Sequence, residues 1–249
     1  MKLSIVTGTL NRLEHLKRCI ASVRASCVKL EHEIIIVDGG STDGSLEWLC
    51  AQNDIALIEQ GEPLGAVAAF NTGFAQAQGE YVAALNDDAE VVGDTYPRAV
   101  KYLDTNPKVG QLAIPFGYSD ATPEVQSVNA LNKRFVYANF SVTRRELGER
   151  VGWWGDFYQY AGDTRLSIEI VKLGFTVVPL DGGAIIHHQV HDATRKPNIE
   201  SPRLGYLYSP RVRAQITFET QREAREHARE RQRQNQARAR TALNRRRGR

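Results

Sequence analysis

Short apolar segments with strand propensity alternate closely with helical segments over residues 3–85, and this alternation is the strongest constraint on the fold. Residues 33–37 (Glu-Ile-Ile-Ile-Val) are nearly all apolar, as in a strand that is covered on both faces. The pattern predicts an α/β fold with a mainly parallel central sheet flanked by helices. The expected strands are Leu3–Thr7, Glu33–Val37, Ile55–Glu59 and Tyr81–Leu85, and the expected helices cover residues 13–23, 45–52 and 65–77.

The second half of the chain is less regular. We expect residues 1–213 to form the folded domain and residues 214–249 to form a separate tail. Within the second half, residues 117–132 are polar and are expected to form a loop. The expected helices are Tyr96–Thr105 and Thr164–Leu173, and the expected strands are Val109–Pro115, Arg134–Thr143, Phe175–Pro179 and Ala184–Ile186.

Polar residues gather at the carboxyl ends of the expected strands. Thr7 and Thr9 end the first strand, Asp38 ends the second, and Asp87 and Asp88 follow the fourth. The carboxyl ends of parallel strands form the usual ligand-binding edge of an α/β sheet. This convergence predicts a binding site at that edge.

Asn86, Asp87 and Asp88 directly follow the apolar segment Tyr81–Leu85. Adjacent carboxylates repel each other and are costly to desolvate unless a cation neutralises them, and a divalent metal is the usual cation at a sheet edge. Because neighbouring residues point in opposite directions, we expect Asp88 to bind Mg²⁺ or Mn²⁺ directly, while Asp87 acts through water or holds a ribose. The alternative is that the three residues only form a polar turn.

Asp38 precedes a glycine-rich loop over residues 39–44. At a strand end, its carboxylate can accept a hydrogen bond from a base or from a ribose hydroxyl. The alternative is a turn or helix-capping role, which fits Asp43 better than Asp38.

Residues 153–160 are rich in aromatic side chains and precede Asp163. An aromatic-walled cleft would raise the pKa of Asp163 and let it act as a base, although a carboxylate at a helix start can also simply complement the helix dipole. Asp156 has the same two interpretations as Asp163. Trp153 and Trp154 are expected either to stack on a flat ring or to belong to the core.

His187, His188 and His191 lie close together after an expected strand. Their spacing lacks a glutamate-bearing helical motif and any cysteine partner, which argues against a zinc site. We expect one of them to meet a phosphate or to complete the metal site at Asp88, and the others to be surface residues.

The formal net charge of +3 conceals an asymmetry. Residues 219–249 contain eleven arginines and four glutamates, so a mildly acidic chain carries a strongly basic tail. The tail has high helix propensity but no apolar stripe, which predicts a solvated helix or a disordered arm. It could contact an anionic polymer or an anionic membrane, or it could be an oligomerisation or solubility helix.

Other features indicate a cytoplasmic protein. No apolar run approaches the roughly 20 residues that span a bilayer. The N-terminus lacks the long apolar core of a signal peptide. The cysteines Cys19, Cys27 and Cys50 have no metal-type spacing and fit reduced thiols.

Four segments of the chain carry a family pattern: residues 5–12 (Ile-Val-Thr-Gly-Thr-Leu-Asn-Arg), 36–44 (Ile-Val-Asp-Gly-Gly-Ser-Thr-Asp-Gly), 86–88 (Asn-Asp-Asp) and 157–166 (Phe-Tyr-Gln-Tyr-Ala-Gly-Asp-Thr-Arg-Leu). Together they resemble the motifs of family-2 glycosyltransferases with the GT-A fold. Residues 36–44 are similar to the signature V-D-[DNG]-x-S-x-D-x-[ST], and residues 157–166 are similar to F-F-x-Y-x-E-D-x-D-L. The resemblance covers roughly residues 1–191.

The resemblance implies an inverting transfer of a sugar from a nucleoside diphosphate sugar, with a UDP-sugar favoured and Mn²⁺ or Mg²⁺ as cofactor. The acceptor would be a hydroxyl of a glycan, a lipid-linked molecule or modified DNA. A nucleotide-binding half would cover about 1–92 and an acceptor half about 93–213. The implied nucleotide-binding residues are Thr7, Thr9, Asn11, Arg12, Asp38, Gly65, Asn71 and Asp87. Asp88 would bind the metal with His187 or His188, Asp163 would be the catalytic base, and Trp153, Trp154 and Asp156 would contact the acceptor.

The chain departs from the family pattern at four positions. Asn86 replaces the first acidic residue of the metal motif, Gly162 and Arg165 replace a glutamate and an aspartate beside the base, and Pro63 stands where asparagine is common. Two other functions remain open. A nucleotidyltransferase usually has a loop richer in glycine and basic residues after its first strand, and a nucleic-acid-binding protein could combine a degenerate domain with the basic arm.

Overall fold

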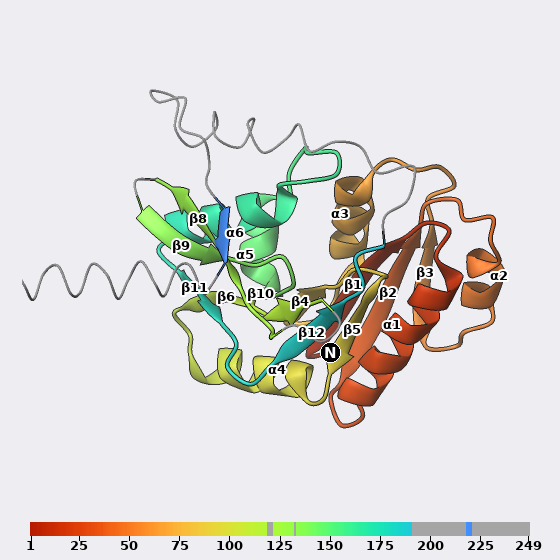
Figure 1. Ribbon diagram of the computed structural model, residues 1–249, viewed down its shortest axis with the longest axis horizontal. Helices are drawn as coiled ribbons and strands as arrows, with labels where there is room; N and C mark the ends of the chain where they lie inside the picture. The colour runs from red at the N-terminus through yellow and green to blue at the C-terminus, as the bar shows by residue number, and fades with distance from the viewer. Residues whose placement is uncertain (119–121, 132, 191–217, 221–249) are drawn as a thin grey trace, which may run out of the picture.

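A seven-stranded sheet lies at the centre of the computed structural model, which describes residues 1–118, 122–131, 133–190 and 218–220 (Figure 1). Its strand order is β11-β6-β10-β4-β1-β2-β3. Within this sheet β10 runs antiparallel to both neighbours, and the other strands run parallel to one another. The predicted α/β class with a mainly parallel sheet is confirmed. The strands are β1 (Leu3–Thr9), β2 (His32–Asp38), β3 (Ile55–Glu59), β4 (Tyr81–Ala84), β6 (Val109–Ala113), β10 (Ser141–Arg144) and β11 (Thr176–Pro179).

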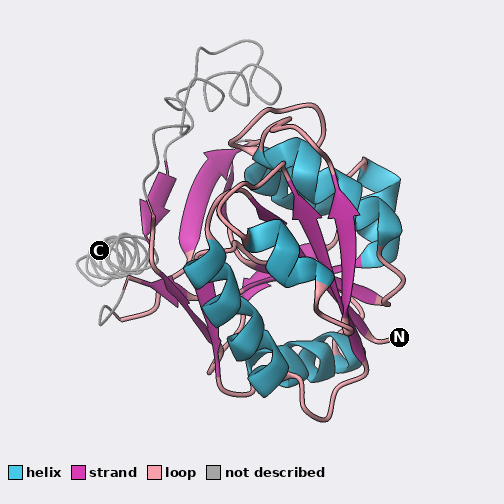
Figure 2. Cartoon of the chain, turned by 90° about the vertical axis from the view of Figure 1, so that its right-hand side faces the viewer, coloured by secondary structure: helices cyan, strands magenta, loops and turns pink. Residues whose placement is uncertain are grey.

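Helices cover both faces of the sheet, as Figure 1 shows and as the side view in Figure 2 repeats. The helices α3 (Ala66–Gln76), α5 (Arg145–Val151) and α6 (Gly162–Lys172) lie on one face. The helices α1 (Leu13–Ser26) and α4 (Thr95–Thr105) lie on the other, and the short α2 (Ser45–Cys50) packs beside α1.

Alternation along the central strands explains this layering. On β2, Ile34 and Ile36 join the core under α1 and α4, while Ile35 joins the core under α3 and α6. On β1, Ile5 joins the core under α1 and α4, and Val6 joins the core under α3 and α6. Because successive side chains of a strand point to opposite faces, a continuous apolar run can bury both faces at once.

Two small three-stranded sheets complete the described fold. One has the order β5-β12-β7, with β5 (Ala89–Val92), β12 (Ala184–His187) and β7 (Phe116–Gly117). The other has the order β13-β8-β9, with β13 (Phe218–Thr220), β8 (Gln126–Ala130) and β9 (Lys133–Tyr137).

The structure corrects several predictions in the second half. Residues 126–130, expected in a loop, form β8 because they pair with β9 and β13. The single strand expected over Arg134–Thr143 is two strands, β9 and β10, in different sheets. Neither β5 nor α5 was predicted. Within the expected tail, Phe218–Thr220 pairs with β8, and the rest of residues 214–249 and the expected boundary at residue 213 lie outside the described residues.

Within the part of the chain that the structure describes, no helix is both long enough and apolar enough to cross a membrane.

Gly73 sets how closely α3 approaches the sheet. A Cβ atom built on Gly73 would lie 2.3 Å from Cγ1 of Val6 on β1. We expect Gly73→Ala to lower the free energy of unfolding by about 1–3 kcal/mol through overpacking, although alanine favours helix formation. Urea unfolding measures the change. The double variant Gly73→Ala/Val6→Ala should be more stable than the sum of the two single losses of unfolding free energy predicts, because Val6→Ala removes the atom that the new Cβ meets. If the two losses simply add, the proposed clash between residues 73 and 6 is wrong.

Candidate active site

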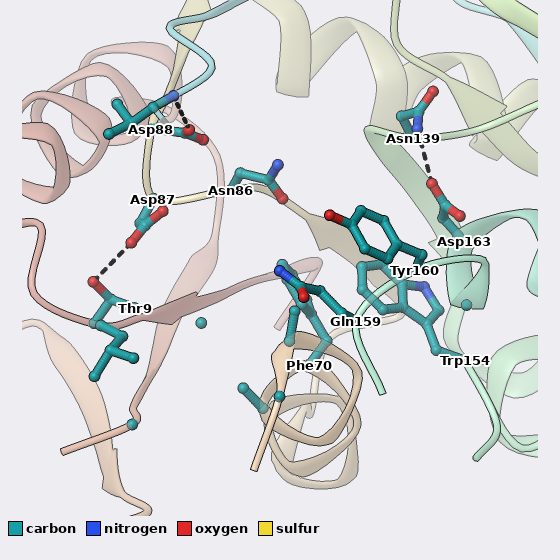
Figure 3. A pocket seen from close by; sticks show the side chains of 18 of the residues that line it. Thr9, Phe70, Asn86, Asp87, Asp88, Asn139, Trp154, Gln159, Tyr160 and Asp163 are labelled. Carbon is teal, nitrogen blue, oxygen red and sulfur yellow. Dashed lines mark hydrogen bonds between the residues drawn. The ribbon is translucent and has the colours of Figure 1, made fainter. Parts of the chain in front are cut away.

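A pocket of about 900 Å³ opens at the carboxyl edge of the central sheet (Figure 3). Its walls come from the ends of β1, β2 and β4, the start of α3, the segment 154–163 and the end of β12. The predicted edge site is therefore a real concave pocket, of a size that fits a small-molecule ligand. The predicted site residues that line it are Thr9, Arg12, Gly65, Asp87, Asp88, Trp154, Asp163 and His187.

Asp87 is buried at the end of β4 and is held by two groups from the first strand and loop. Thr9 Oγ1 donates to Asp87 Oδ2 at 3.0 Å, and Arg12 Nη1 donates to Asp87 Oδ1 at 2.9 Å. Burial raises the pKa of Asp87 to about 6, against the lowering effect of the Arg12 charge, and the adjacent Asp88 adds to the rise. The carboxylate is therefore costly to ionise even beside a guanidinium.

Asp88 is buried beside Asp87, but more neighbouring groups offset the negative charge of its carboxylate. Arg12 Nη1 lies 3.4 Å from its Oδ2, and the backbone N–H of Val190 donates to Oδ2 at 2.9 Å. Nε2 of His187 lies 3.2 Å from its Oδ1. Burial alone would raise the pKa of Asp88, but His187, Val190 and Arg12 outweigh it and lower the pKa to about 2. Asp88 is therefore the more readily ionised carboxylate of the pair.

The two neighbouring histidines have different surroundings. His187 on β12 stands in the register opposite Ala89 on β5, and this pairing brings it to Asp88. The side chain of His188 points to Glu90, with 2.6 Å between Nε2 and Oε1, and does not line the pocket. Of the two candidate metal ligands, only His187 brings its side chain to the Asp88 carboxylate, whereas His188 meets Asp88 through its backbone N–H, and the predicted His191 lies outside the described residues.

Thr7, Asn11 and Asp38 lie beside the pocket without lining it. The side chain of Asn11 accepts from the N–H of Thr42 at 2.7 Å. Oδ1 of Asp38 accepts from the backbone N–H groups of Gly40 and Ser41, so Asp38 does form a turn. Its Oδ2 is buried and has no hydrogen-bond partner among the described residues, which leaves one acceptor for a ligand.

Two predicted nucleotide-binding residues, Gly65 just before α3 and Asn71 on it, have separate roles in the structure. Gly65 lines the pocket at φ +93°, and a Cβ atom there would lie 2.4 Å from the carbonyl oxygen of Tyr158. Asn71 does not line the pocket. Its side chain donates to the carbonyl of Gly155 at 2.8 Å and accepts from the N–H of Trp154 at 3.1 Å, so it fixes the aromatic segment to α3.

Trp154 and Trp153 do not form a paired stacking surface. Trp154 lines the pocket, and its ring packs 4.3 Å from Phe70. Trp153 is stacked on Phe74 at 4.5 Å in the core and does not line the pocket. Asp156 is exposed and also lies outside the lining. Among the three expected acceptor contacts, the structure therefore places only Trp154 at the pocket.

Asp163 stands in the first turn of α6, across the pocket from Asp87 and Asp88 (Figure 3). The N–H of Thr164 donates to Oδ1 at 2.6 Å, and Nδ2 of Asn139 donates to Oδ2 at 2.9 Å. Burial raises the pKa of Asp163 above its ordinary value, against these neutral hydrogen bonds. A carboxylate with a raised pKa that faces a pocket is suited to accept a proton.

Sequence reasoning missed two groups at this site. Asn139 lines the pocket and contacts Asp163, but it lay inside the run that was predicted as one strand. The backbone of Val190 contacts both Asp88 and Arg12, and no side-chain pattern could have shown this. A polar residue inside an apolar alternating run is the signal that could have identified Asn139.

Sequence comparison connects these motifs with known proteins. Residues 4–161 match the family described as Glycosyl transferase family 2. Glycosyltransferase AglE of Haloferax volcanii is 23% identical over 193 residues, which cover 70% of this chain and 62% of the relative.

Two solved structures share the fold. A mannosyltransferase from Pyrobaculum calidifontis, in complex with GDP-Man and Mn²⁺, has a TM-score of 0.62 at 21% identity and covers 77% of this chain and 58% of that chain. S. aureus TarS 1-349, in complex with UDP-GlcNAc, has a TM-score of 0.63 at 19% identity. The match covers 83% of this chain and 64% of that chain. The predicted GT-A fold is confirmed, and the chain spans less than two thirds of the length of each of these relatives.

Asp87 should give the protein a specific pH dependence of stability. Its folded-state pKa of about 6 exceeds the ordinary 3.8, so the folded chain binds this proton more tightly than the unfolded chain. The resulting stability is fully present below pH 3.8 and is lost as the pH rises through 6, a loss of about 3 kcal/mol. Urea unfolding between pH 4 and 8 should show this loss in the wild type and not in Asp87→Asn. The exposed Glu14→Gln is the control, and equal profiles for wild type and Asp87→Asn would contradict the assignment.

Proposed function

The chain belongs to glycosyl transferase family 2, and from this membership we propose that it transfers a sugar from a nucleoside diphosphate sugar to an acceptor hydroxyl. The observation that carries the proposal is the pocket itself, which has a carboxylate–arginine centre on one wall and Asp163 on the other (Figure 3). A UDP-sugar is the proposed donor, with an inverting displacement at the anomeric carbon.

The proposed donor lies along the ends of β1, β2 and β4. Oδ2 of Asp38, buried just behind the lining and without a hydrogen-bond partner among the described residues, is the proposed acceptor for the base, and the backbone at Gly39 and Gly65 allows close approach. Arg12 places a guanidinium beside the diphosphate and offsets the negative charge that builds up as the nucleoside diphosphate departs. Thr9 keeps Asp87 oriented at the same wall.

Asp88 and His187 fit a divalent cation. Among the described residues, no group of three or more His, Cys, Asp or Glu side chains is arranged to hold a metal ion. Oδ1 of Asp88 is nevertheless buried without a hydrogen bond in that part of the chain, and it faces an imidazole nitrogen at 3.2 Å. Mg²⁺ and Mn²⁺ sites with few protein ligands take their other ligands from phosphates and water. A bound Mn²⁺ or Mg²⁺ would offset charge on the leaving diphosphate.

Asp163 is the proposed catalytic base. Its carboxylate lies on the wall that the donor's leaving group does not occupy, so an acceptor hydroxyl beside it can attack from the side opposite the departing diphosphate. Asp163 accepts the hydroxyl proton as the oxygen attacks. The raised pKa of Asp163 strengthens it as a base compared with an exposed aspartate.

The base assignment predicts a separation of chemistry from binding. Asp163→Asn keeps the size of the side chain but cannot accept a proton, so we expect transfer to fall by at least about 100-fold. Donor affinity should stay close to that of the wild type because Asp163 lies across the pocket from the donor wall. Isothermal titration with the donor and a nucleoside diphosphate release assay measure the two effects. Loss of both together, or of neither, would contradict the assignment.

The donor and metal assignment predicts a ligand-specific stabilisation. A thermal-shift screen with UDP, GDP, dTDP, CDP and their sugars, with and without Mn²⁺, should raise the midpoint for the cognate donor by mass action. The metal-dependent part of the shift should disappear in Asp88→Ala and persist in Asp94→Ala, which lies on the surface at the start of α4. An equal shift in Asp88→Ala would remove Asp88 from the metal site.

We also propose that the arginine-rich segment contacts an anionic acceptor or surface. β13 pairs Thr220 with Gln126, a residue that lines the pocket, and Thr220 directly precedes the arginine-rich residues 221–249 in the sequence. Basic segments bind polyanions through salt-sensitive contacts.

Deletion of residues 221–249 retains all residues of β13 and should weaken binding to duplex DNA or to anionic vesicles at least about 10-fold at low salt. Fluorescence anisotropy and vesicle sedimentation measure the two cases. Unchanged binding in both assays would remove the tail from acceptor recognition.

A further inference from the structure

Asn139 connects the proposed base to a different part of the fold. It lies in the short segment between β9 and β10, and its Nδ2 donates to Oδ2 of Asp163 at 2.9 Å (Figure 3). A carboxylate oxygen can only accept, so the amide nitrogen and not the amide oxygen must face Asp163. Both side chains line the pocket.

The second oxygen of Asp163 is held from another direction. Its Oδ1 accepts from the backbone N–H of Thr164 at 2.6 Å and from Thr164 Oγ1 at 3.1 Å. Rotation of the carboxylate about its own axis would therefore break contacts on both oxygens at once. Thr164 fixes one oxygen from within α6, and Asn139 fixes the other from outside the helix.

The buried hydroxyl of Ser167 connects the segment that contains Asn139 to helix α6. Ser167 lies one turn after Asp163 and is fully buried. Its Oγ accepts from the backbone N–H of Ala138 at 3.1 Å and donates to Oε1 of Gln111 on β6 at 2.7 Å. The residue immediately before Asn139 is thereby tied to the same helix that carries Asp163.

Packing alone does not account for an asparagine at this position. Oδ1 of Asn139 is buried and has no hydrogen-bond partner among the described residues. An unpaired buried acceptor destabilises a fold, and an apolar side chain would avoid that penalty. The amide hydrogen-bonds both Asp163 and the side chain of Tyr137, and the contact with Asp163 is the one that reaches the proposed base.

We propose that Asn139 is a positioning residue for Asp163, which it holds in a single orientation toward the pocket and in its ionised form. The inference rests on the proposed function, because it gives Asn139 a role only if Asp163 is the base. A hydrogen bond to the charged form favours that form, so loss of Asn139 makes Asp163 harder to ionise.

The other ionisable groups near Asp163 do not replace Asn139. Tyr137 on β9 faces Asp163, and burial and the negative charge of Asp163 both raise the pKa of the phenol. It therefore stays neutral over the working pH range. Arg165 on the same helix donates to the carbonyls of Trp153 and Val151 instead.

The test compares the pH dependence of donor hydrolysis in the wild type, Asn139→Ala, Asp163→Asn and Asn71→Ala, with water as the acceptor and nucleoside diphosphate release as the readout. In Asn139→Ala, we expect kcat to fall about 10- to 100-fold, the range for one lost hydrogen bond to a charged group. The acid limb of its profile should move to higher pH. Asn71→Ala removes a different half-buried asparagine that holds the aromatic segment, and its acid limb should not move.

The outcomes separate the two proposals. An active wild type with an inactive Asp163→Asn and an unmoved acid limb in Asn139→Ala would overturn the inference and leave the proposed function standing. Full activity in Asp163→Asn, or no hydrolysis of any donor by the wild type, would instead overturn the base assignment or the proposed function.

A double-mutant cycle with Asn139→Ala and Asp163→Ala in urea unfolding at pH 7 needs no substrate. A favourable coupling supports the contact between the two side chains, and a coupling near zero overturns the inference even if no donor is turned over.

Discussion

Two adjacent carboxylates, Asp87 and Asp88, are buried at the end of β4, and the arrangement of the pocket depends on how their charge is compensated. Neither could remain ionised in isolation, because burial and mutual repulsion both favour protonation. The compensation comes from three distant parts of the chain: Arg12 from the loop before α1, His187 from β12, and the N–H of Val190 beyond it. The first loop and the end of the described domain are thus brought to the same point of the sheet.

Two of the four departures from the family pattern, Gly162 and Arg165, share one structural cause on the pocket wall that carries Asp163. A Cβ atom on Gly162 would lie 2.6 Å from the Cβ of Trp154, so the position expected to hold glutamate has no space for a side chain. Arg165, which stands at the position of an aspartate, donates to the carbonyls of Trp153 and Val151 at 2.6 and 2.7 Å. Both residues therefore contact the segment that places Trp154 in the pocket wall.

The first half of the fold could be predicted because its signals are local. The strand β2 is a continuous apolar run, and its end at Asp38 and the end of β4 at Asp87 follow from the sequence and from parallel-sheet geometry. The second half depends on pairing between distant segments. β5 is four residues long and forms because it pairs with β12, and this pairing, which no local pattern shows, decides that the side chain of His187 and not that of His188 reaches Asp88. Asn139 was missed for the same reason, because its contact with Asp163 arises only when β9 and β10 separate into different sheets.

The two walls of the pocket bury carboxylates in different ways, and this difference separates their chemical roles. Asp88 is surrounded by Arg12 and His187, and its pKa falls to about 2, which keeps it ionised and suited to bind cations. Among the described residues, the hydrogen bonds to Asp163 come from the neutral groups of Thr164 and Asn139, and burial leaves its pKa raised. A carboxylate stabilised by a full positive charge is a poor base, whereas one held by neutral donors keeps its affinity for a proton. In the proposed reaction, Arg12 and His187 lie on the wall of the leaving group while neutral donors hold the proposed base Asp163, so one pocket suits both tasks at the same pH.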